Sequence, residues 1–344
     1  MIHTDVMKLY SNEIVFRGHP DKVCDQISAS LLDAFLHGDK ETRAGIEVAG
    51  GKGQIFITGE VTSKTKVNIE AVTRRVLVDC GYDAKAYKII NNLGLQSRDI
   101  ALGVDTGGAG DNGMMFGYAC DGTNEMLPVA MVILQKFSRK YDELRLKDSR
   151  FKSDGKAQIT GEYDESFKLK RIVAFTICYQ NTELERSATD LMLVQIASGI
   201  ANEFGVLVDK FLTNPTGRFE VGGFEGDAGL TGRKIVVDAY QSFANSGGGC
   251  MNGKDPSKVD FSGTHKARDL AKQVLKKYGL SWCEIQLSYA IGQARPLAIY
   301  IDSNRGNIEP TEKMYKDCEL KRIIKDLKLK SICYEDLAKF GHFN

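Results

Sequence analysis

The fold is set by a pattern that first appears in residues 23–60, which read VCDQISASLLDAFLHGDKETRAGIEVAGGKGQIFITGE. Apolar residues recur at helical spacing from Val23 to Phe35, which predicts a helix that ends near Gly38. Two short runs with strand character follow, 43–48 and 54–60, joined by a glycine-rich turn. The stretch therefore predicts a helix followed by two neighbouring strands.

The same order of elements recurs twice more along the chain. It favours an α+β fold of three structurally similar domains, each a small mixed sheet with helices on one face. We expect domains at about 1–105, 106–231 and 232–344, with room for strands to be exchanged between segments. The further predicted elements are helices over 67–80, 129–146, 184–204, 266–278 and 312–327, and strands over 87–90, 156–160, 169–178, 283–291 and 297–301.

Composition excludes several classes of protein. The 344 residues include 46 Lys and Arg and 45 Asp and Glu, a net charge of +1, so a nucleic-acid or membrane-surface binder is not expected. The longest apolar run, 129–134, is far shorter than the ~20 residues of a membrane span, and residues 1–15 lack a secretory signal pattern. The eight cysteines form no C-x-x-C pair, which indicates free thiols in the cytoplasm rather than a zinc or redox site.

Glycine is abundant, with 35 residues against 6 prolines. The glycine-rich or polar segments each hold a carboxylate, and three of them also hold cations; they are 17–22, 107–113, 222–234 and 247–260. Glycine lets a backbone approach a ligand closely, Lys and Arg neutralise phosphate, and isolated carboxylates suit Mg²⁺. The combination predicts a magnesium–polyphosphate site; the alternative is four ordinary turns with solvated charges.

Two further segments match known nucleotide-binding motifs, but the residues around them do not fit those motifs. Segment 108–113 fits G-x-G-x-x-G, but 114–119 has the pattern of a strand rather than a helix, so a dinucleotide-binding fold is not expected. Segment 248–254 is close to a Walker A motif, but Asp255 occupies the position of the metal-binding Ser or Thr. We retain only Lys254 from it, as a phosphate contact.

His19 stands between Gly18 and Pro20, just ahead of a helix predicted to begin near Asp21. An imidazole beside a helix N-terminus lies at a favourable anion site. A lone histidine is more often structural, but this position favours a functional role.

Motifs from about Ser11 to Phe343 resemble those of the S-adenosylmethionine synthetases (methionine adenosyltransferases). They are GHPDK at 18–22, GAGD at 108–111, MFGYA at 115–119, NPTGRF at 214–219, GD and GLTGRK within 226–234, GKDPSKVD at 253–260, and EIQ and SYAIG within 284–292. The family fold, three similar α+β domains in a pseudo-threefold arrangement, agrees with the repeated order of elements.

The resemblance implies a reaction between ATP and L-methionine. The methionine sulfur attacks C5′ of ATP and expels tripolyphosphate, which is then cleaved to pyrophosphate and phosphate. It also implies Mg²⁺, two ions per site, and K⁺ as cofactors. The expected assembly is a homodimer with active sites at its interface, or a tetramer built from it, and no nucleic acid or membrane is expected as a partner.

The resemblance also implies roles for single residues. His19 would donate to the departing O5′ and the triphosphate, and Phe219 would stack on adenine. Four residues are expected to be catalytic: His19, Lys156, Arg233 and Lys254. The expected ATP-binding set is His19, Asp154, Lys156, Arg218, Phe219, Asp227, Arg233, Lys234, Cys250 and Lys254.

Most of the residues that the resemblance implies for metal and methionine binding are Asp or Glu. Asp21, Asp260 and Glu13 would hold Mg²⁺, and Glu47 would hold K⁺. Glu47 and Glu60 lie on predicted strands, and the alternative is that both are simply exposed. The expected methionine-binding set is Glu60, Gln96, Asp111, Asp227 and Lys258.

The chain also departs from the family pattern. Arg17 stands where an acidic residue commonly precedes GHPDK, and Cys250 is larger than the usual residue after the three glycines. Only Thr106 and Gly107 separate Asp105 from GAGD, so the family's loop is shortened here. Two other functions stay open: a different ATP-dependent transferase or phosphohydrolase, and a silent regulatory subunit. The second is disfavoured because the cations and carboxylates assigned to chemistry are all present.

Overall fold

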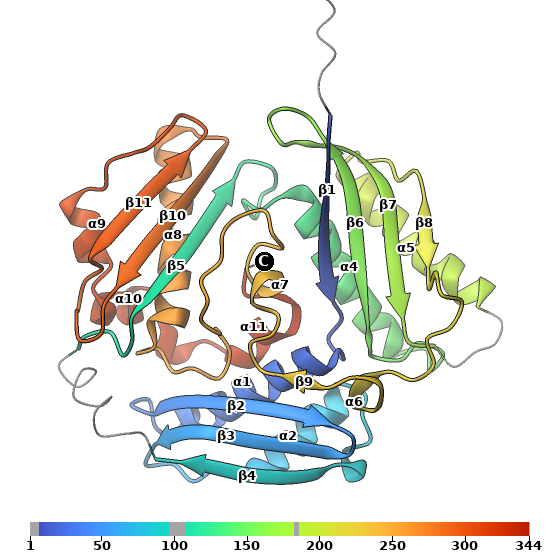
Figure 1. The fold of residues 1–344 in the computed structure, drawn as a ribbon, viewed down its shortest axis with the longest axis horizontal. Coiled ribbons are helices and arrows are strands. Elements are labelled where there is room, and N and C mark those ends of the chain that lie inside the picture. Colours follow the sequence, from blue (N-terminus) through green and yellow to red (C-terminus); the bar gives the residue numbers. More distant parts are fainter. Residues whose placement is uncertain (1–6, 96–106, 182–185, 344) are drawn as a thin grey trace, which may run out of the picture.

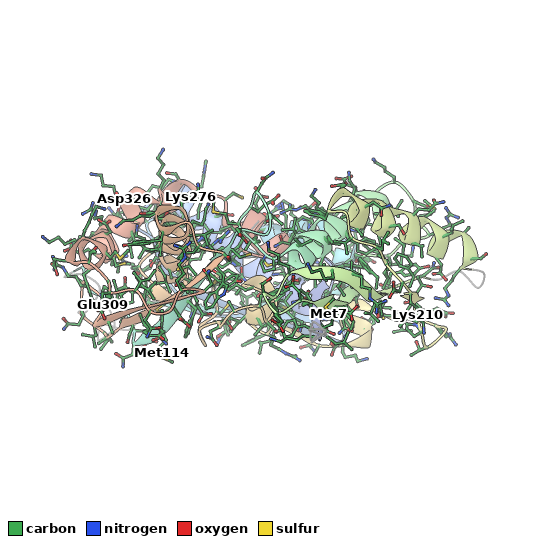
Figure 2. The ribbon with its side chains drawn as sticks, turned by 90° about the horizontal axis from the view of Figure 1, so that it is seen from above. Met7, Met114, Lys210, Lys276, Glu309 and Asp326 are labelled. Atoms are coloured by element: carbon green, nitrogen blue, oxygen red, sulfur yellow. The ribbon has the colours of Figure 1, made fainter. Side chains whose placement is uncertain are left out.

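Three small sheets surround a central region of the molecule in the computed structural model (Figure 1). Helices lie on one side of the sheets, so that Lys276 and Asp326, both on helices, project from the face opposite to Met114, which lies on a strand (Figure 2). The predicted α+β class with three similar sheet–helix units is confirmed. The structure describes residues 7–95, 107–181 and 186–343.

The first sheet has the strand order β4-β3-β2-β9. β2 (Arg43–Gly51) and β3 (Gln54–Thr62) form the predicted antiparallel hairpin, and β4 (Lys88–Gly94) runs parallel to β3. Alternate residues of β2 are buried, as expected for a strand with one face against a core. α1 (Pro20–Gly38) and α2 (Ile69–Asp79) pack on that face.

The second sheet repeats this plan, and the third has three antiparallel strands. In the second, the order is β1-β6-β7-β8, and in the third it is β11-β10-β5. The second unit comprises β1 (Lys8–Val15), α4 (Val129–Arg145), β6 (Gly155–Tyr163), β7 (Leu169–Tyr179), α5 (Ser187–Glu203) and β8 (Phe211–Thr213). The third comprises β5 (Gly113–Cys120), α8 (Val259–Tyr278), β10 (Trp282–Tyr289), β11 (Ala298–Ser303), α9 (Glu312–Asp317) and α10 (Leu320–Asp326). The remaining elements are η1 (Ala84–Ala86), α6 (Gly223–Gly226), β9 (Gly229–Leu230), α7 (Ile235–Asp238), η2 (Leu329–Ser331) and α11 (Tyr334–Phe340).

Three strands lie in a sheet whose other strands come from a different part of the chain. β1 pairs with β6, β5 pairs with β10, and β9 pairs with β2. These exchanges tie the three units together by backbone hydrogen bonds. The division at about 105 and 231 remains our proposal for consecutive chain segments.

Several predicted bounds were wrong. The helix predicted over 266–278 begins at Val259 as α8, because its first two turns include Asp260, Gly263 and Thr264, which hide the apolar period. The helix predicted over 312–327 is two helices, α9 and α10. The strand predicted over 283–291 ends at Tyr289, and α11 was not predicted.

The open faces of the sheets carry exposed apolar side chains. Leu9, Phe56, Met114, Leu230 and Tyr300 lie on strands and expose between 38% and 67% of their surface. Single exposed apolar residues are ordinary, but all three sheets carry such residues, which is compatible with an association surface. Within the described ranges, no helix combines the length and the apolar character needed to cross a membrane.

We expect Gly117→Ala to destabilise the fold by about 1–3 kcal/mol, because overpacking forces the backbone to shift. β5 approaches α8 so closely that a Cβ at Gly117 would lie 1.9 Å from the carbonyl carbon of Ala267. Urea denaturation measures the free energy of unfolding. Gly199→Ala is the control, since nothing lies within 4 Å of a Cβ there; in helix α5 it should stabilise by up to about 1 kcal/mol. Equal effects of the two substitutions would contradict the packing account.

Candidate functional site

His19 caps the N-terminus of α1, as its position in the sequence predicts. Its Nδ1 accepts a hydrogen bond from the backbone N–H of Asp21 at 3.2 Å, so the neutral ring carries its proton on Nε2. Burial and the nearby Lys234 charge lower the pKa of His19 to about 4. The imidazole is therefore a neutral donor at physiological pH.

The carboxylate of Asp21 links α1 to β9 and to the segment that follows it. Its carboxylate is buried; Oδ1 accepts the backbone N–H of Leu230 at 2.8 Å, and Oδ2 lies 2.5 Å from Nζ of Lys234. Nε of Arg233 lies 3.7 Å from Oδ1. The helix N-terminus and one carboxylate thus hold two cations beside His19.

A pocket of about 230 Å³ lies between His19 and β6. It is lined by His19, Asp154, Lys156, Phe219 and Asp227, together with four glycines or aliphatic residues and Cys178. Oδ2 of Asp154 accepts the backbone N–H of Gly223 at 2.7 Å, but burial outweighs this bond and raises the pKa of Asp154 to about 6. An aromatic ring beside buried polar groups is suited to a nucleoside.

Arg218 does not reach this pocket. Its side chain is 74% exposed and pairs with Glu220 at 2.6 Å. The predicted ATP contact of Arg218 would therefore need the guanidinium to turn from its observed position.

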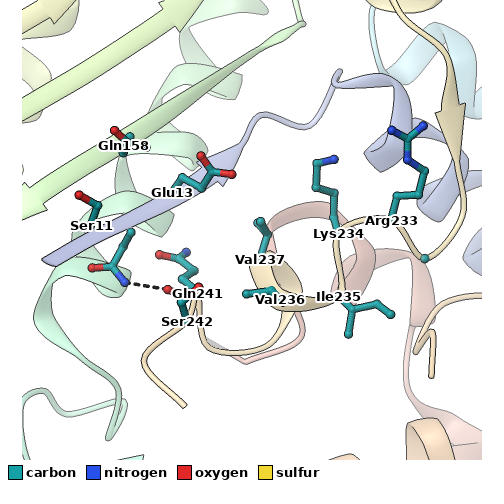
Figure 3. A pocket seen from close by; sticks show the side chains of 12 residues that line it. Ser11, Glu13, Gln158, Arg233, Lys234, Ile235, Val236, Val237, Gln241 and Ser242 are labelled. Atoms are coloured by element: carbon teal, nitrogen blue, oxygen red, sulfur yellow. Dashed lines mark hydrogen bonds between the residues drawn. The ribbon is translucent and has the colours of Figure 1, made fainter. Parts of the chain in front are cut away.

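A larger pocket of about 550 Å³ is lined by Lys234 (Figure 3). Glu13 from β1 and Lys234 enter it from opposite sides, and Arg233 and Gln158 also line it. Glu13, which was predicted to lie near metal, thus lines the same pocket as the two cations that Asp21 holds.

The other predicted charged residues form a second group along β2, β3 and the start of α8. Nζ of Lys254 lies 2.5 Å from Oδ2 of Asp260, and Nζ of Lys258 lies 3.4 Å from Oε1 of Glu60. Burial raises the pKa of Glu47, against the effect of the Lys254 charge. Glu47 and Glu60 are half-buried rather than simply exposed.

The side chain of Asp111 makes no bond to this group within the described part of the chain. Asp111 accepts the backbone N–H of Asn112 at 2.7 Å, and Asp260 lies near Gly113, two residues further along. Gln96 lies outside the described residues.

The two groups lie at different places along β2. Gly45 of β2 faces Glu60 across the hairpin and bridges to Lys254, whereas Leu230, which Asp21 binds, pairs with Ala49. At about 3.3 Å per residue, these two points on β2 are about 13 Å apart. Cys250 lies between the groups, where it is buried against Gly232.

The carboxylates of both groups fit a magnesium–phosphate complex. No group of three or more His, Cys, Asp or Glu side chains that could hold a metal ion occurs among residues 7–95, 107–181 and 186–343. Mg²⁺ commonly takes only one or two carboxylates from protein and completes its shell with phosphate and water. Asp21 and Asp260 each offer a single carboxylate next to a lysine, which matches that requirement.

A buried polar network beneath the site was not anticipated. Lys22, Asp25 and Asp238 are buried, and Lys22 pairs with both carboxylates. Burial opposes the charge of Lys22, but the carboxylates of Asp238 and Asp25 raise its pKa above the ordinary value. The only signal in the sequence is the i,i+3 spacing of Lys22 and Asp25 on an otherwise apolar helix face.

Gln241 is a second residue that the sequence did not mark. It has φ of 51° and is 2% exposed, and neither amide atom has a hydrogen-bond partner in the described part of the chain. Arg17, the departure ahead of GHPDK, bonds to Gln26 at 2.7 Å and pairs with Asp142 at 3.5 Å. The side chain of Arg17 is thus held by contacts within the fold.

Comparison with known proteins agrees with the motifs. Models of the S-adenosylmethionine synthetase family match the chain with the N-terminal domain over residues 7–98, the central domain over 106–219 and the C-terminal domain over 221–344. The chain is also similar to the S-adenosylmethionine synthase of Salinispora tropica, with 37% identity over 372 residues that cover 98% of this chain and 93% of that protein.

We expect Lys234→Ala to raise the pKa of His19 from about 4 toward its ordinary value of 6.5. The substitution removes a neighbouring cation, opens the ring to water and leaves Asp21 free to attract the imidazolium. A pH titration of the imidazole by NMR measures the change. Lys330→Ala is the control, since Lys330 pairs with Glu41 away from His19. An unchanged or lower pKa in Lys234→Ala would contradict the geometry described.

Proposed function

Because this chain belongs to the S-adenosylmethionine synthetase family, we propose that it is a methionine adenosyltransferase that makes S-adenosylmethionine from ATP and L-methionine. The observation that carries the proposal is the cluster of His19, Asp21, Arg233 and Lys234 at the N-terminus of α1. It sets a neutral imidazole donor and two cations around one carboxylate, within a chain that matches all three family domains.

The reaction is the attack of the methionine sulfur on C5′ of ATP with loss of tripolyphosphate. A neutral thioether is a weak nucleophile, so alignment and stabilisation of the leaving group supply most of the rate. Orientation supplies on the order of 7–11 kcal/mol, and a well-placed donor at the departing oxygen about 3–4 kcal/mol. The Nε2–H of His19 is assigned as that donor, because Nδ1 is occupied by the Asp21 amide.

Lysine and arginine side chains would neutralise the negative charge of the departing triphosphate. Lys156, Arg233 and Lys234 approach from this chain, and Lys254 belongs to the second group of residues. Asp21, Asp260 and Glu13 are assigned to Mg²⁺, which when bound neutralises phosphate charge, and Glu47 is assigned to K⁺. The same cations would hold the tripolyphosphate while it is cleaved to pyrophosphate and phosphate.

The nucleoside is assigned to the pocket beside β6. Phe219 offers a ring for stacking on adenine, and Asp154 and Asp227 offer polar contacts. Arg218 joins the ATP set only after it turns inward, and Cys250 lies where the polyphosphate and second groups meet.

The methionine is assigned to the other end of the first sheet. Glu60 and Asp111 suit its ammonium, and Lys258 suits its carboxylate. Gln96 is assigned to methionine from the family resemblance alone. Asp227 is assigned to methionine on the same ground, although its side chain lines the nucleoside pocket.

A homodimer would explain how the residues assigned to the nucleoside and those assigned to methionine, which lie apart in one chain, can form one active site. The sulfur must come within about 3–3.5 Å of C5′. Along β2, however, Gly51, which lies beside Ala228 at the nucleoside pocket, is about 20 Å from Gly45, which faces Glu60. A twofold axis across the open sheet faces would bring the nucleoside end of one chain to the methionine end of the next. The exposed apolar residues on those faces support this arrangement. A tetramer of two such dimers is compatible with it.

Eight free thiols support a cytoplasmic location.

Product analysis tests the proposed function directly. The protein incubated with ATP, methionine, Mg²⁺ and K⁺ should form S-adenosylmethionine, pyrophosphate and phosphate in equal amounts, and chelation of the metal should stop the reaction. Phosphate release without S-adenosylmethionine would instead support a phosphohydrolase or a transferase with another thioether substrate. Binding of ATP without any product would support a silent subunit.

We expect His19→Ala to lower the rate of adenosyl transfer about a hundredfold, which corresponds to about 3 kcal/mol. The change removes the assigned donor to O5′, but the fold should survive because the ring is not part of either core cluster. Rapid-quench measurement of S-adenosylmethionine gives the rate, and circular dichroism checks the fold. His37→Ala, at the last turn of α1, is the matched control. A near-wild-type rate for His19→Ala would contradict the assigned role.

A further inference from the structure

A buried ionic cluster lies beneath the segment that carries Arg233 and Lys234. Nζ of Lys22 lies 3.3 Å from Oδ2 of Asp25 and 2.6 Å from Oδ1 of Asp238. None of the three side chains is more than 3% exposed. Buried charges are costly unless they are paired and hydrogen-bonded, and none of these three lines either pocket of the site.

Asp25 connects this cluster to the segment above it. Its Oδ1 accepts the backbone N–H of Gly232 at 2.9 Å, directly before Arg233. Its Oδ2 is held by the ammonium of Lys22, so the carboxylate is fixed in orientation. Asp238 anchors the far end of the segment, because its carboxylate accepts from Lys22 and from Nδ2 of Asn252 at 3.2 Å.

Asp21 and Asp25 hold the segment in different ways. Asp21 bonds to Leu230 and Lys234, and it is the carboxylate assigned to metal. Metal binding would compete for the same oxygens. The bond from Gly232 to Asp25 lies below the site and does not compete with a ligand.

We propose that Asp25 is a positioning residue for polyphosphate binding, which holds Arg233 and Lys234 in place through the N–H of Gly232, with Lys22 as its counter-ion. The proposal rests on the proposed function in one respect, that Arg233 and Lys234 bind the polyphosphate. Asp25 itself touches no substrate.

The test measures the affinity of the full chain for inorganic tripolyphosphate with Mg²⁺, by calorimetry. Asp25→Ala removes the acceptor of Gly232 and should raise the Kd about tenfold or more, since a misplacement of about 1 Å is costly at a preorganised site. Asp25→Asn keeps an oxygen at the same place and should stay within about threefold of wild type. Wild-type affinity in Asp25→Ala would overturn the proposal.

Asp33 provides a matched control on the same helix. Its carboxylate accepts the backbone N–H groups of Tyr334 at 2.9 Å and Glu335 at 2.8 Å, away from the site. Asp33→Ala should lower the melting temperature as Asp25→Ala does but leave the tripolyphosphate Kd unchanged. A similar loss of affinity in both variants would show a general structural effect and overturn the proposal.

A further variant covers the case in which Asp25→Ala does not fold. Asp25→Glu keeps the negative charge opposite Lys22 but moves the acceptor by one methylene group, and it should still weaken tripolyphosphate binding severalfold. Wild-type affinity in Asp25→Glu would then overturn the proposal. Wild-type protein that binds tripolyphosphate but makes no S-adenosylmethionine would contradict the proposed function alone. Wild-type protein that binds no tripolyphosphate would contradict both.

Discussion

The first two turns of α1 are the constraint on which the site depends. His19, Asp21, Lys22 and Asp25 lie within seven consecutive positions, and three of them bind the chain between Leu230 and Asp238. β9 pairs with β2 directly before that segment, so a short strand and a helix N-terminus fix it from two sides. Two cations are thereby held next to a neutral imidazole before any ligand arrives. Such preorganisation lowers the reorganisation that the reaction requires.

A lysine–carboxylate pair occurs in each of the two groups. Lys234 pairs with Asp21 and Lys254 with Asp260, each at 2.5 Å. In each pair the lysine is assigned to polyphosphate and the carboxylate to metal. A magnesium–polyphosphate complex could replace both contacts at once, because the metal satisfies the carboxylate and the phosphate satisfies the lysine. Metal or phosphate alone would satisfy only one partner and leave the other charge uncompensated, which favours their joint binding.

Local pattern in the sequence predicted the elements whose apolar period is regular, such as α1, β2 and β3. It also placed His19 correctly ahead of α1. The N-terminal turns of α8 escaped prediction because polar and glycine residues there are buried by tertiary contacts. The exchange of β1, β5 and β9 depends on pairing over long distances along the chain, which no local signal contains. The same holds for Asp25, whose partner Gly232 is remote in sequence.

The central claim is that one active site combines the α1 group of one chain with the Lys254 group of another. The most direct test is a heterodimer of His19→Ala and Lys254→Ala chains, purified through two different tags. Each homodimer should be nearly inactive, whereas the heterodimer contains one site with both groups intact and should regain about half of the wild-type activity. A heterodimer as inactive as the two homodimers would contradict the shared site.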